Sequence, residues 1–313
     1  MKVFLDVAQA LLLVAGAPLV RGIIARIKAR IQRRQGASIW RPYADLGKLF
    51  RKEDLVPPSA SAVFRLAPLL LFAVTVLATG FVPVLHNSAL FGTASDFILL
   101  VYLIALGRFF MSLGAIDGGS AFGGMGASRE ALVSTLAEAP LLLSLMSVAI
   151  LAHSASISEI VSWTLRQNFF DISLVHALAF AALVIVGIAE TGRLPVDNPT
   201  THLELTMIHE AMVLEYSGPS LALIEWAQAI KLNLVLALLI GLFGPWGMAS
   251  GLSAGAIGIS IAAYLLKLGA LIVTIALVES SLAKLRMYLV PDFLGVASAL
   301  GILAIIFTAF TGR

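Results

Sequence analysis

Long apolar segments constrain the fold of this 313-residue chain more than any other feature. Runs of about 20 mostly apolar residues, the length that a helix needs to cross a bilayer, lie at 3–20, 63–85, 94–115, 131–152, 173–190, 221–243, 254–278 and 293–311. Lipid offers no hydrogen-bond partner to the backbone, so only helices or closed barrels span it. Runs this long and continuous exclude a barrel, and the sequence predicts an all-α, polytopic membrane protein with about eight transmembrane helices.

The composition agrees with this fold class. Hydrophobic residues make up 59% of the chain and charged residues only 12%, whereas soluble domains average about 25% charged residues. A secreted signal peptide over residues 1–20 would carry its basic end before the apolar stretch, and only Lys2 lies there. We therefore expect the first apolar segment to be retained as a helix.

The distribution of basic residues predicts the orientation. Ten of the 21 Lys and Arg residues lie within Arg21–Lys52, and cytoplasmic loops carry such an excess. With this loop inside, the remaining inside connections add Arg129, Arg193, Lys284 and Arg286, while the outside holds Lys2, Arg166 and Arg313. One span more or fewer would scatter these charges, so the bias supports eight spans with both termini on the outer side.

No repeat of 20–50 residues and no low-complexity linker divides the chain, so residues 1–313 are expected to form a single transmembrane helical domain. Its inside loops, near 21–62, 116–130, 191–220 and 279–292, carry most of the charge. The outside loops, near 86–93, 153–172 and 244–253, are short or carry few charged residues. We expect any partner to bind at the cytoplasmic face.

Several classes of site are disfavoured. The absence of cysteine excludes disulfides, thiolate zinc sites and cysteine-held Fe–S or nickel centres within this chain. The net charge of +3 fits anionic headgroups better than nucleic acid. His209-Glu210 lacks the second His of a zinc-protease helix, so no metal site is expected. The glycine-rich stretch Gly118–Gly126 follows a membrane segment rather than a strand, and we expect a closely packed turn there, with Arg129 and Glu130 beginning the next helix.

Ionisable residues occur within the predicted spans, where lipid penalises a charge by about 2.5–3.5 kcal/mol at a helix centre. They are Arg108, Glu138, Glu190, Lys231, Lys267 and Glu279. Any single one can be explained by structural pairing, for example Lys267 with a carboxylate of a neighbouring helix. Acids and bases on four or more helices favour a polar path through the bundle, since a purely structural bundle uses small residues and hydroxyls.

The densest motif is Ala189–Asp197, which reads Ala-Glu-Thr-Gly-Arg-Leu-Pro-Val-Asp. It resembles the Ala-Glu-Thr-x-Arg-x-Pro-Phe-Asp motif of the subunit 1 family of respiratory complex I. That family includes the membrane subunit of energy-converting group 4 NiFe-hydrogenases, such as formate hydrogenlyase and hydrogenase-4.

Two further matches follow the order of that family. Gln32–Gly36 resembles its Gln-x-Arg-x-Gly, and Tyr43–Glu53 resembles its Ala-Asp-x-x-Lys-Leu-x-x-Lys-Glu. Gly126–Arg129, followed nine residues later by Glu138, matches its Gly-x-x-Arg and membrane Glu. The short insert Ile39–Tyr43 and the pair Ser217-Gly218 after Glu215-Tyr216 are more similar to the hydrogenase-associated members than to the quinone-reducing ones.

The resemblance implies a membrane subunit of a bacterial or archaeal cell-membrane complex, with no redox centre and no catalytic residue of its own. Its partners would be a hydrogenase-like large subunit and a small Fe–S subunit on the cytoplasmic loops, with antiporter-like subunits beside it in the lipid. Fe–S clusters, and a Ni-Fe centre where the large subunit holds one, would belong to those partners. The chain would couple redox chemistry in the soluble arm to movement of H⁺ or Na⁺.

Residue roles are expected as follows. Proton-relay candidates are Arg108, Glu138, Glu190, Glu204, Glu210, Glu215, Lys231, Lys267 and Glu279. Arg129, Arg193, Asp197, His202 and His209 form the junction loop. Arg34, Trp40, Tyr43, Asp45 and Lys48 mix apolar anchors with charges, the composition of a docking surface, although a basic loop can also act only as a topological anchor.

The chain also departs from the family. After Asp197 the family pattern requires Glu-x-Glu-x-Glu, and here Thr200 and His202 occupy the first two positions, with only Glu204 kept. Two interpretations stay open: His202, His209 and Glu210 substitute for the missing acids, or this member lacks part of the proton route. A short amphipathic helix is expected within 203–214.

Two other functions remain as alternatives. One is the quinone-binding membrane subunit of respiratory NADH dehydrogenase, whose tail tunnel would lie between the first helix, the Gln32–Lys52 loop and the fifth and sixth helices. The other is a secondary transporter working alone, for which inverted repeats with matching broken helices are expected. The sequence contains no such repeats.

Overall fold

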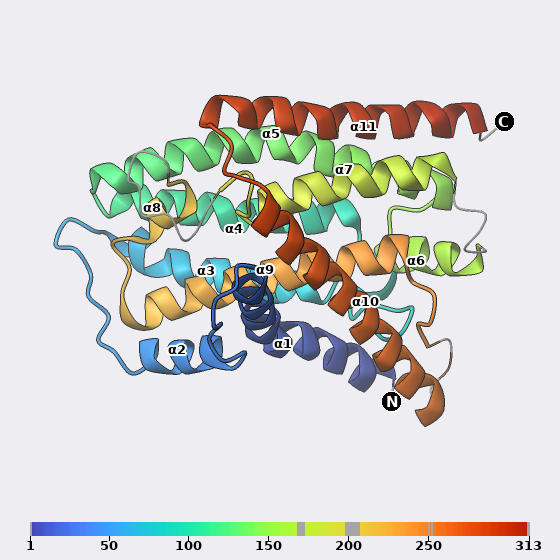
Figure 1. The fold of residues 1–313 in the computed structure, drawn as a ribbon, viewed down its shortest axis with the longest axis horizontal. Coiled ribbons are helices and arrows are strands. Elements are labelled where there is room, and N and C mark those ends of the chain that lie inside the picture. The colour runs from blue at the N-terminus through green and yellow to red at the C-terminus, as the bar shows by residue number, and fades with distance from the viewer. Residues whose placement is uncertain (1, 168–172, 198–206, 250, 252, 312–313) are drawn as a thin grey trace.

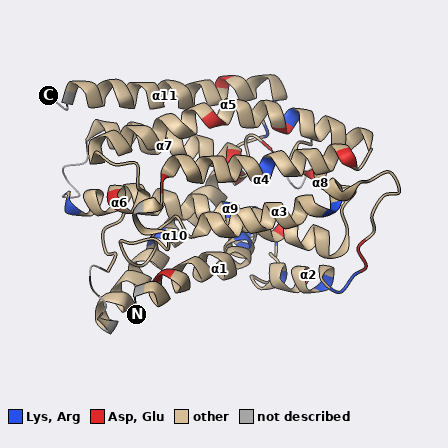
Figure 2. Ribbon diagram, turned by 180° about the vertical axis from the view of Figure 1, so that it is seen from behind, with Lys and Arg blue, Asp and Glu red and all other residues tan. Residues whose placement is uncertain are grey.

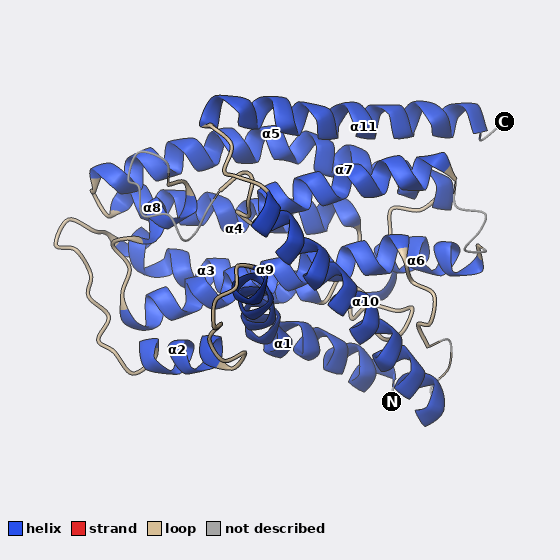
Figure 3. Cartoon of the chain, in the orientation of Figure 1, coloured by secondary structure: helices blue, strands red, loops and turns tan. Residues whose placement is uncertain are grey.

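The computed structural model describes residues 2–167, 173–197, 207–249, 251 and 253–311, which form helices joined by turns (Figure 1, Figure 3). The long helices are α1 (Lys2–Ile31), α3 (Ala62–Thr79), α4 (Phe97–Asp117), α5 (Ala121–Ala152), α7 (Leu174–Glu190), α9 (Gly218–Phe243), α10 (Ala254–Ser281) and α11 (Val290–Thr311). The short ones are α2 (Arg41–Leu49), α6 (Ile157–Arg166), α8 (His209–Val213) and the 3₁₀ turns η1 (Gly92–Ala94) and η3 (Met287–Leu289).

Each predicted apolar segment overlaps one of the long helices, so the all-α polytopic class is confirmed. In the described part of the chain, seven helices are long and apolar enough to cross a membrane, and α7, with 17 residues, is a shorter apolar helix. Both chain ends lie at the same end of the bundle in Figure 1, opposite α2 and α8. Which compartment each end faces stays a prediction, so the end that holds α2 and α8 is called the inner end, and the opposite one the outer end, as predicted.

The predicted boundaries of two inside loops were wrong, and one outside loop with the predicted bounds contains a short helix that was not predicted. The basic segment begins inside α1, which continues to Ile31, and contains the further helix α2. The glycine-rich stretch is not a turn throughout, because α5 starts at Ala121 and carries Arg129 in its third turn. The outer connection at 153–172 contains the helix α6. Basic residues and glycines were interpreted as helix ends. Helix propensity is a weak predictor, and packing against neighbouring helices overrides it here.

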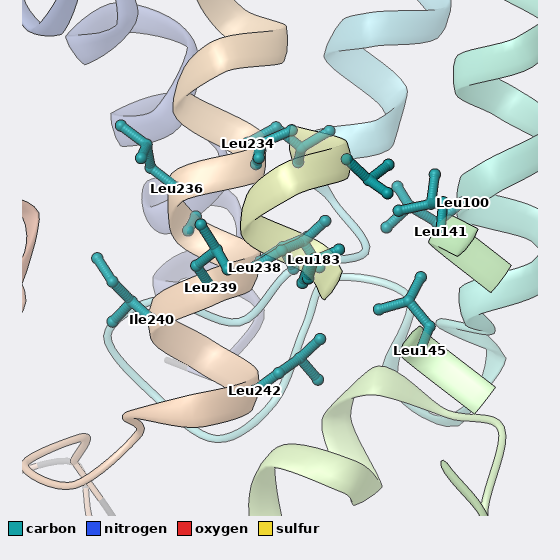
Figure 4. Close-up of a cluster of buried hydrophobic side chains, with 14 of the residues drawn as sticks. Leu100, Leu141, Leu145, Leu183, Leu234, Leu236, Leu238, Leu239, Ile240 and Leu242 are labelled. Atoms are coloured by element: carbon teal, nitrogen blue, oxygen red, sulfur yellow. The ribbon is translucent and has the colours of Figure 1, made fainter. Parts of the chain in front are cut away.

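Helix α9 occupies the centre of the bundle. A helix that is apolar all round is expected to be buried on all sides, and nearly every residue of α9 from Leu232 to Leu242 is buried. Its leucines pack against Leu183 of α7, Leu100 of α4 and the α5 leucines Leu141 and Leu145 (Figure 4). α11 lies along α5 and α7 (Figure 1).

Helix α1 contains Pro18, which has no N–H to donate to the Val14 carbonyl four residues before it. That carbonyl accepts from Trp226 at 3.0 Å, and the neighbouring carbonyls of Leu13 and Ala15 accept from Asn233 (2.9 Å) and Tyr43. The second half of α1 turns and is seen almost end-on in Figure 1. Side chains of α9 and α2 therefore stabilise the turn of α1 that precedes Pro18.

Two glycines allow segments to approach closely at the inner end. A Cβ on Gly22 of α1 would lie 2.2 Å from the Ile39 carbonyl oxygen, so the basic connection can fold back onto α1 only at a glycine. A Cβ on Gly126 of α5 would lie 2.9 Å from Ala211 Cβ of α8. These contacts hold the basic connection against α1, and α8 against α5.

Lys267 closes the outer end of α9. Its Nζ donates to the carbonyl oxygen of Gly244 (2.6 Å) and to that of Trp246. The last carbonyls of a helix have no partner within the helix and carry its negative dipole end, so an ammonium group fits there. The expected carboxylate partner for Lys267 is replaced by backbone oxygens.

Replacing this ammonium should lower the stability of the bundle. In Lys267→Met both carbonyls lose a charged donor, and bonds of that kind contribute about 1.5–3 kcal/mol each. Thermal unfolding of the purified chain in detergent should show a lower midpoint. Thr274→Val is the matched control, because the exposed Thr274 hydroxyl bonds only to its own helix. Equal midpoints for the two variants would contradict the capping role.

Candidate functional site

A cavity of about 290 Å³ lies at the inner half of the bundle, between α1, α3, α4, α5, the 191–197 segment, α8, α9 and α10. It is large enough for several water molecules. Its wall holds five basic and five acidic side chains, and these are Arg21, Lys28, Arg108, Arg193 and Lys231 with Glu130, Glu190, Asp197, Glu210 and Glu279. Figure 2 shows that charges are sparse over the rest of the long helices.

Glu190, the last residue of α7, is an acid held between two cations. Its Oε1 accepts from Arg108 of α4, and its Oε2 lies 2.9 Å from Lys231 Nζ of α9. The Glu190 side chain is 3% exposed and the Arg108 side chain 10%. Charges buried this deeply are tolerated when they are paired, so these three residues fasten α4, α7 and α9 to each other.

Glu279 near the end of α10 has the same arrangement. Its Oε2 lies 3.1 Å from Lys28 Nζ of α1, and its Oε1 lies 2.7 Å from an Arg193 guanidinium nitrogen. The Glu279 side chain is 6% exposed. This second group ties the inner half of α1 to α10 and to the segment that follows α7.

Asp197 fixes the start of the segment that leads to α8. Its Oδ1 lies 2.7 Å from Lys284 Nζ, and its Oδ2 accepts from the backbone N–H of His209 at 3.2 Å. The His209 ring contacts the Gln228 side chain of α9. Asp197 therefore bridges the α10–α11 connection and the first turn of α8.

Glu210 differs from these acids because it has no hydrogen bond or ion pair among the described residues. Arg21, a nearby cation, is bound to Glu225 of α9. Burial raises the pKa of Glu210, and the negative charges of Glu225 and Asp197 raise it further, while His209 and Arg21 act in the opposite direction. Glu210 therefore holds a proton at a higher pH than an ordinary glutamate.

Other predicted site residues lie away from the cavity. Glu138 is half-buried on α5 and Glu215 half-buried after α8, and neither has an ion pair in the described part of the chain. Lys267 lies at the outer end, where it caps α9. Arg129 donates to the Met207 carbonyl oxygen at 2.8 Å and holds the approach to α8.

Glu204 and His202, with Thr200, fall outside the described residues, so the two interpretations of the altered family pattern stay as predictions. No group of three or more His, Asp or Glu side chains with metal-site geometry occurs in the part of the chain that the structure describes.

The docking residues divide into two sets. Trp40, which is 60% exposed, lies on the surface together with Arg34 and Lys48. Tyr43 instead turns inward, where its hydroxyl donates to the Ala15 carbonyl oxygen, and partial burial raises its pKa. Asp45 pairs with Arg41 within α2 at 3.4 Å. Tyr43 thus anchors α2 to α1, while the other residues face outward.

Sequence reasoning missed Lys28, Lys284, Glu225 and Gln228 as members of the network. Lys28 was assigned to a loop, yet it follows Arg21 by seven residues, which places both on one face of a continuing helix. No local pattern marks Glu225 or Lys284. Their partners lie 204 and 87 residues away along the chain.

Removing the charge of Glu190 should weaken the fold. In Glu190→Gln the buried Arg108 and Lys231 lose their counter-ion, and breaking a buried pair costs about 3–5 kcal/mol. Less folded protein in membranes and a lower unfolding midpoint in detergent are expected. Glu215→Gln is the matched control, because that half-buried acid has no ion pair among the described residues. A Glu190→Gln midpoint equal to that of the control would refute the clamp.

Comparisons with known proteins agree with this architecture. The family model described as NADH dehydrogenase matches residues 5–309. Hydrogenase-4 component C of Escherichia coli is 35% identical over 97% of this chain and 95% of its own length. Formate hydrogenlyase subunit 4 of the same organism is 34% identical over 93% of this chain and 94% of its own.

A solved structure shares the fold. It is a chain from the membrane-bound sulfane sulfur reductase, an archaeal respiratory membrane complex, with a TM-score of 0.84 and 23% identity. The match covers 98% of this chain and 99% of that one.

Proposed function

The chain belongs to the NADH dehydrogenase family, which is the family of complex I subunit 1, and we propose that it anchors the soluble arm of a hydrogenase-like redox complex. It couples the chemistry of that arm to movement of H⁺, or of Na⁺. The two relatives named as a hydrogenase component and a formate hydrogenlyase subunit support this branch, since each aligns over more than nine-tenths of the chain.

The cavity is the observation that carries the proposal. It joins charged segments of the inner face, which are α8 and the inner half of α1, to Glu190 and Lys231 within the bundle. A hydrated cavity lined with equal numbers of acids and bases permits proton exchange without leaving net charge in lipid. A redox-linked change of charge at the inner face would alter the proton affinity of these groups.

The proposed partners of the inner face are a hydrogenase-like large subunit and a small Fe–S subunit, and both would seat on the docking surface. We define this surface as α2 and its flanking residues 32–40 and 50–55. Exposed Trp40, Phe50 and Leu55 lie there among the basic residues. Aromatic anchors surrounded by charge are typical of protein interfaces.

Changing this surface should release the soluble arm. Trp40→Ala combined with Lys48→Glu removes an anchor and reverses a charge, and we expect at least a tenfold weaker retention of the soluble subunits. Purification of the complex in mild detergent, followed by quantification of iron and of each subunit, measures this. Leu266→Ala, on the exposed face of α10, is the control. Full retention in the double variant would count against the docking role.

Quinone binding is the second candidate function, as expected for a complex I subunit. The quinone tail was expected between α1, the Gln32–Lys52 loop, α7 and α9, and residues of these three helices line the cavity. Trp226 of α9 donates to a carbonyl oxygen of α1, and its ring centroid lies 6.4 Å from that of Phe50 and 5.2 Å from that of Phe72. Extraction of stoichiometric quinone from the purified complex would decide for the alternative.

Antiporter-like membrane subunits are the proposed neighbours of α5. Glu138 is half-buried on this helix and lacks an ion pair in the described residues, and a carboxylate left in lipid is costly. The exposed Thr135 and Ser128 lie on the same helix face. A partner helix that supplies polar groups would remove this cost and continue the proton path.

Neutralising this acid should uncouple the complex. In Glu138→Gln, assembly and the soluble redox activity should persist while ion translocation per turnover falls severalfold, because the side chain can no longer bind and release a proton. Translocation by the complex in inverted vesicles, measured with a pH-sensitive dye, tests this. Thr135→Val on the same face serves as control. Full translocation in assembled Glu138→Gln complex would remove Glu138 from the relay.

A further inference from the structure

The acids around the cavity are not equivalent in their contacts. Glu190 and Glu279 each contact two cations, and Asp197 contacts Lys284 and a backbone N–H. A carboxylate held by two cations keeps its charge, since protonation would leave both cations without a counter-ion. These three acids are therefore satisfied by their neighbours within the cavity wall.

Glu210 and Glu130 are the remaining acids of the cavity wall, and neither has an ion pair among the described residues. Glu210 lies on α8 in the wall of the cavity, beside His209. Arg21 of α1, Glu225 of α9 and Asp197 act on it electrostatically, and burial and its acidic neighbours keep its pKa raised. Other charged groups that face the same cavity are Lys28, Arg108, Arg193, Lys231, Glu190 and Glu279.

Arg21 acts on Glu210 electrostatically while it is bound to another acid. Its guanidinium pairs with Glu225, and both side chains are only partly buried, at 35% and 24% exposure. An arginine in such a position can exchange partners more easily than Arg108, which is 10% exposed. An ionised Glu210 would compete with Glu225 for the same guanidinium group.

We propose that Glu210 is the acid of this cavity that takes up and releases a proton, and that Arg21 shifts from Glu225 toward Glu210 when the proton leaves. The proton comes from water at the inner face, binds the Glu210 carboxylate and neutralises it, while Arg21 pairs with Glu225. When the proton passes on, the carboxylate charge is restored and attracts Arg21. No other bond forms or breaks in this cycle.

The exchange would reach the docking surface through a short path. Arg21 precedes Gly22, against which the Ile39 carbonyl packs, and Trp40 follows Ile39 directly. A shift of Arg21 therefore acts on the segment that carries the aromatic anchor. This inference deepens the proposed function and rests on it only for its physiological role, because titration of Glu210 is measurable without any partner activity.

The experiment is pH-difference infrared spectroscopy of the purified full-length chain in lipid, which follows the C=O band of protonated carboxyl groups. In the unaltered protein one such band should titrate with an apparent pKa above that of an ordinary glutamate. Glu210→Gln should abolish this band, whereas Glu130→Gln, the other unpaired acid of the cavity wall, should retain it.

Two further variants keep the test decisive if Glu210→Gln fails to fold. Glu225→Gln removes a negative neighbour and frees Arg21, so the band should titrate at lower pH. Arg21→Gln removes the exchanging cation, so it should titrate at higher pH. Opposite shifts follow from the charges of the two neighbours alone, so the exchange is read from the Arg21 guanidinium bands, which should change as Glu210 titrates and should not change in Glu210→Gln. A band that survives Glu210→Gln, that disappears in Glu130→Gln, or that stays in place in both the Arg21 and Glu225 variants overturns the proposal.

Ion translocation by the assembled complex is measured in a separate experiment. If the infrared band behaves as expected but ion translocation by the assembled complex is unchanged in Glu210→Gln, Glu210 titrates without serving the relay, so only its physiological role fails while the titration and the proposed function stand. If the complex translocates no ions in any form, the proposed function fails, and the titration of Glu210 remains as measured.

Discussion

The pairing of buried charges determines how the inner half of this protein is assembled. Glu190 and Glu279 each collect two cations from different helices, and ions placed inside a bilayer protein persist only when such partners are present. The two groups join α1, α4, α7, α9 and α10 around one cavity. Pairing of this kind specifies which helices meet, since apolar contacts between helices in lipid are weakly selective.

At the inner face, backbone groups that lack a partner within their own helix form hydrogen bonds with side chains of other segments. Pro18 frees carbonyls of α1, and side chains of α9 and α2 bind them. Asp117 at the end of α4 accepts from Ser61 and from the Phe64 N–H, and so caps the start of α3. Phe64 in turn stacks on Tyr216, whose pKa burial raises. Motif segments distant in the sequence thus become one rigid surface.

Most of the fold followed from the sequence, because helices that cross lipid are specified by the length and hydropathy of single segments. The charged residues of the site could be predicted from the sequence, but the ion pairs that they form could not. Glu190, Arg108, Lys231 and Glu279 were identified as charges within spans, yet the partner of each depends on helix rotation. Lys267 could not be assigned from the sequence. It was grouped with the proton-relay candidates, whereas in the structure it donates to backbone carbonyl oxygens at the end of α9.

The bend in α1 also changes how the protein fits its membrane. A straight helix of 30 residues would be about 45 Å long, which exceeds the hydrocarbon thickness of about 30 Å. Because the helix turns after Pro18, its arginine-bearing half leaves the acyl-chain layer obliquely instead of forcing a tilt of the whole bundle. This half of α1 is also held by its pairs with α9 and α10, so the bend is fixed by the charged interior.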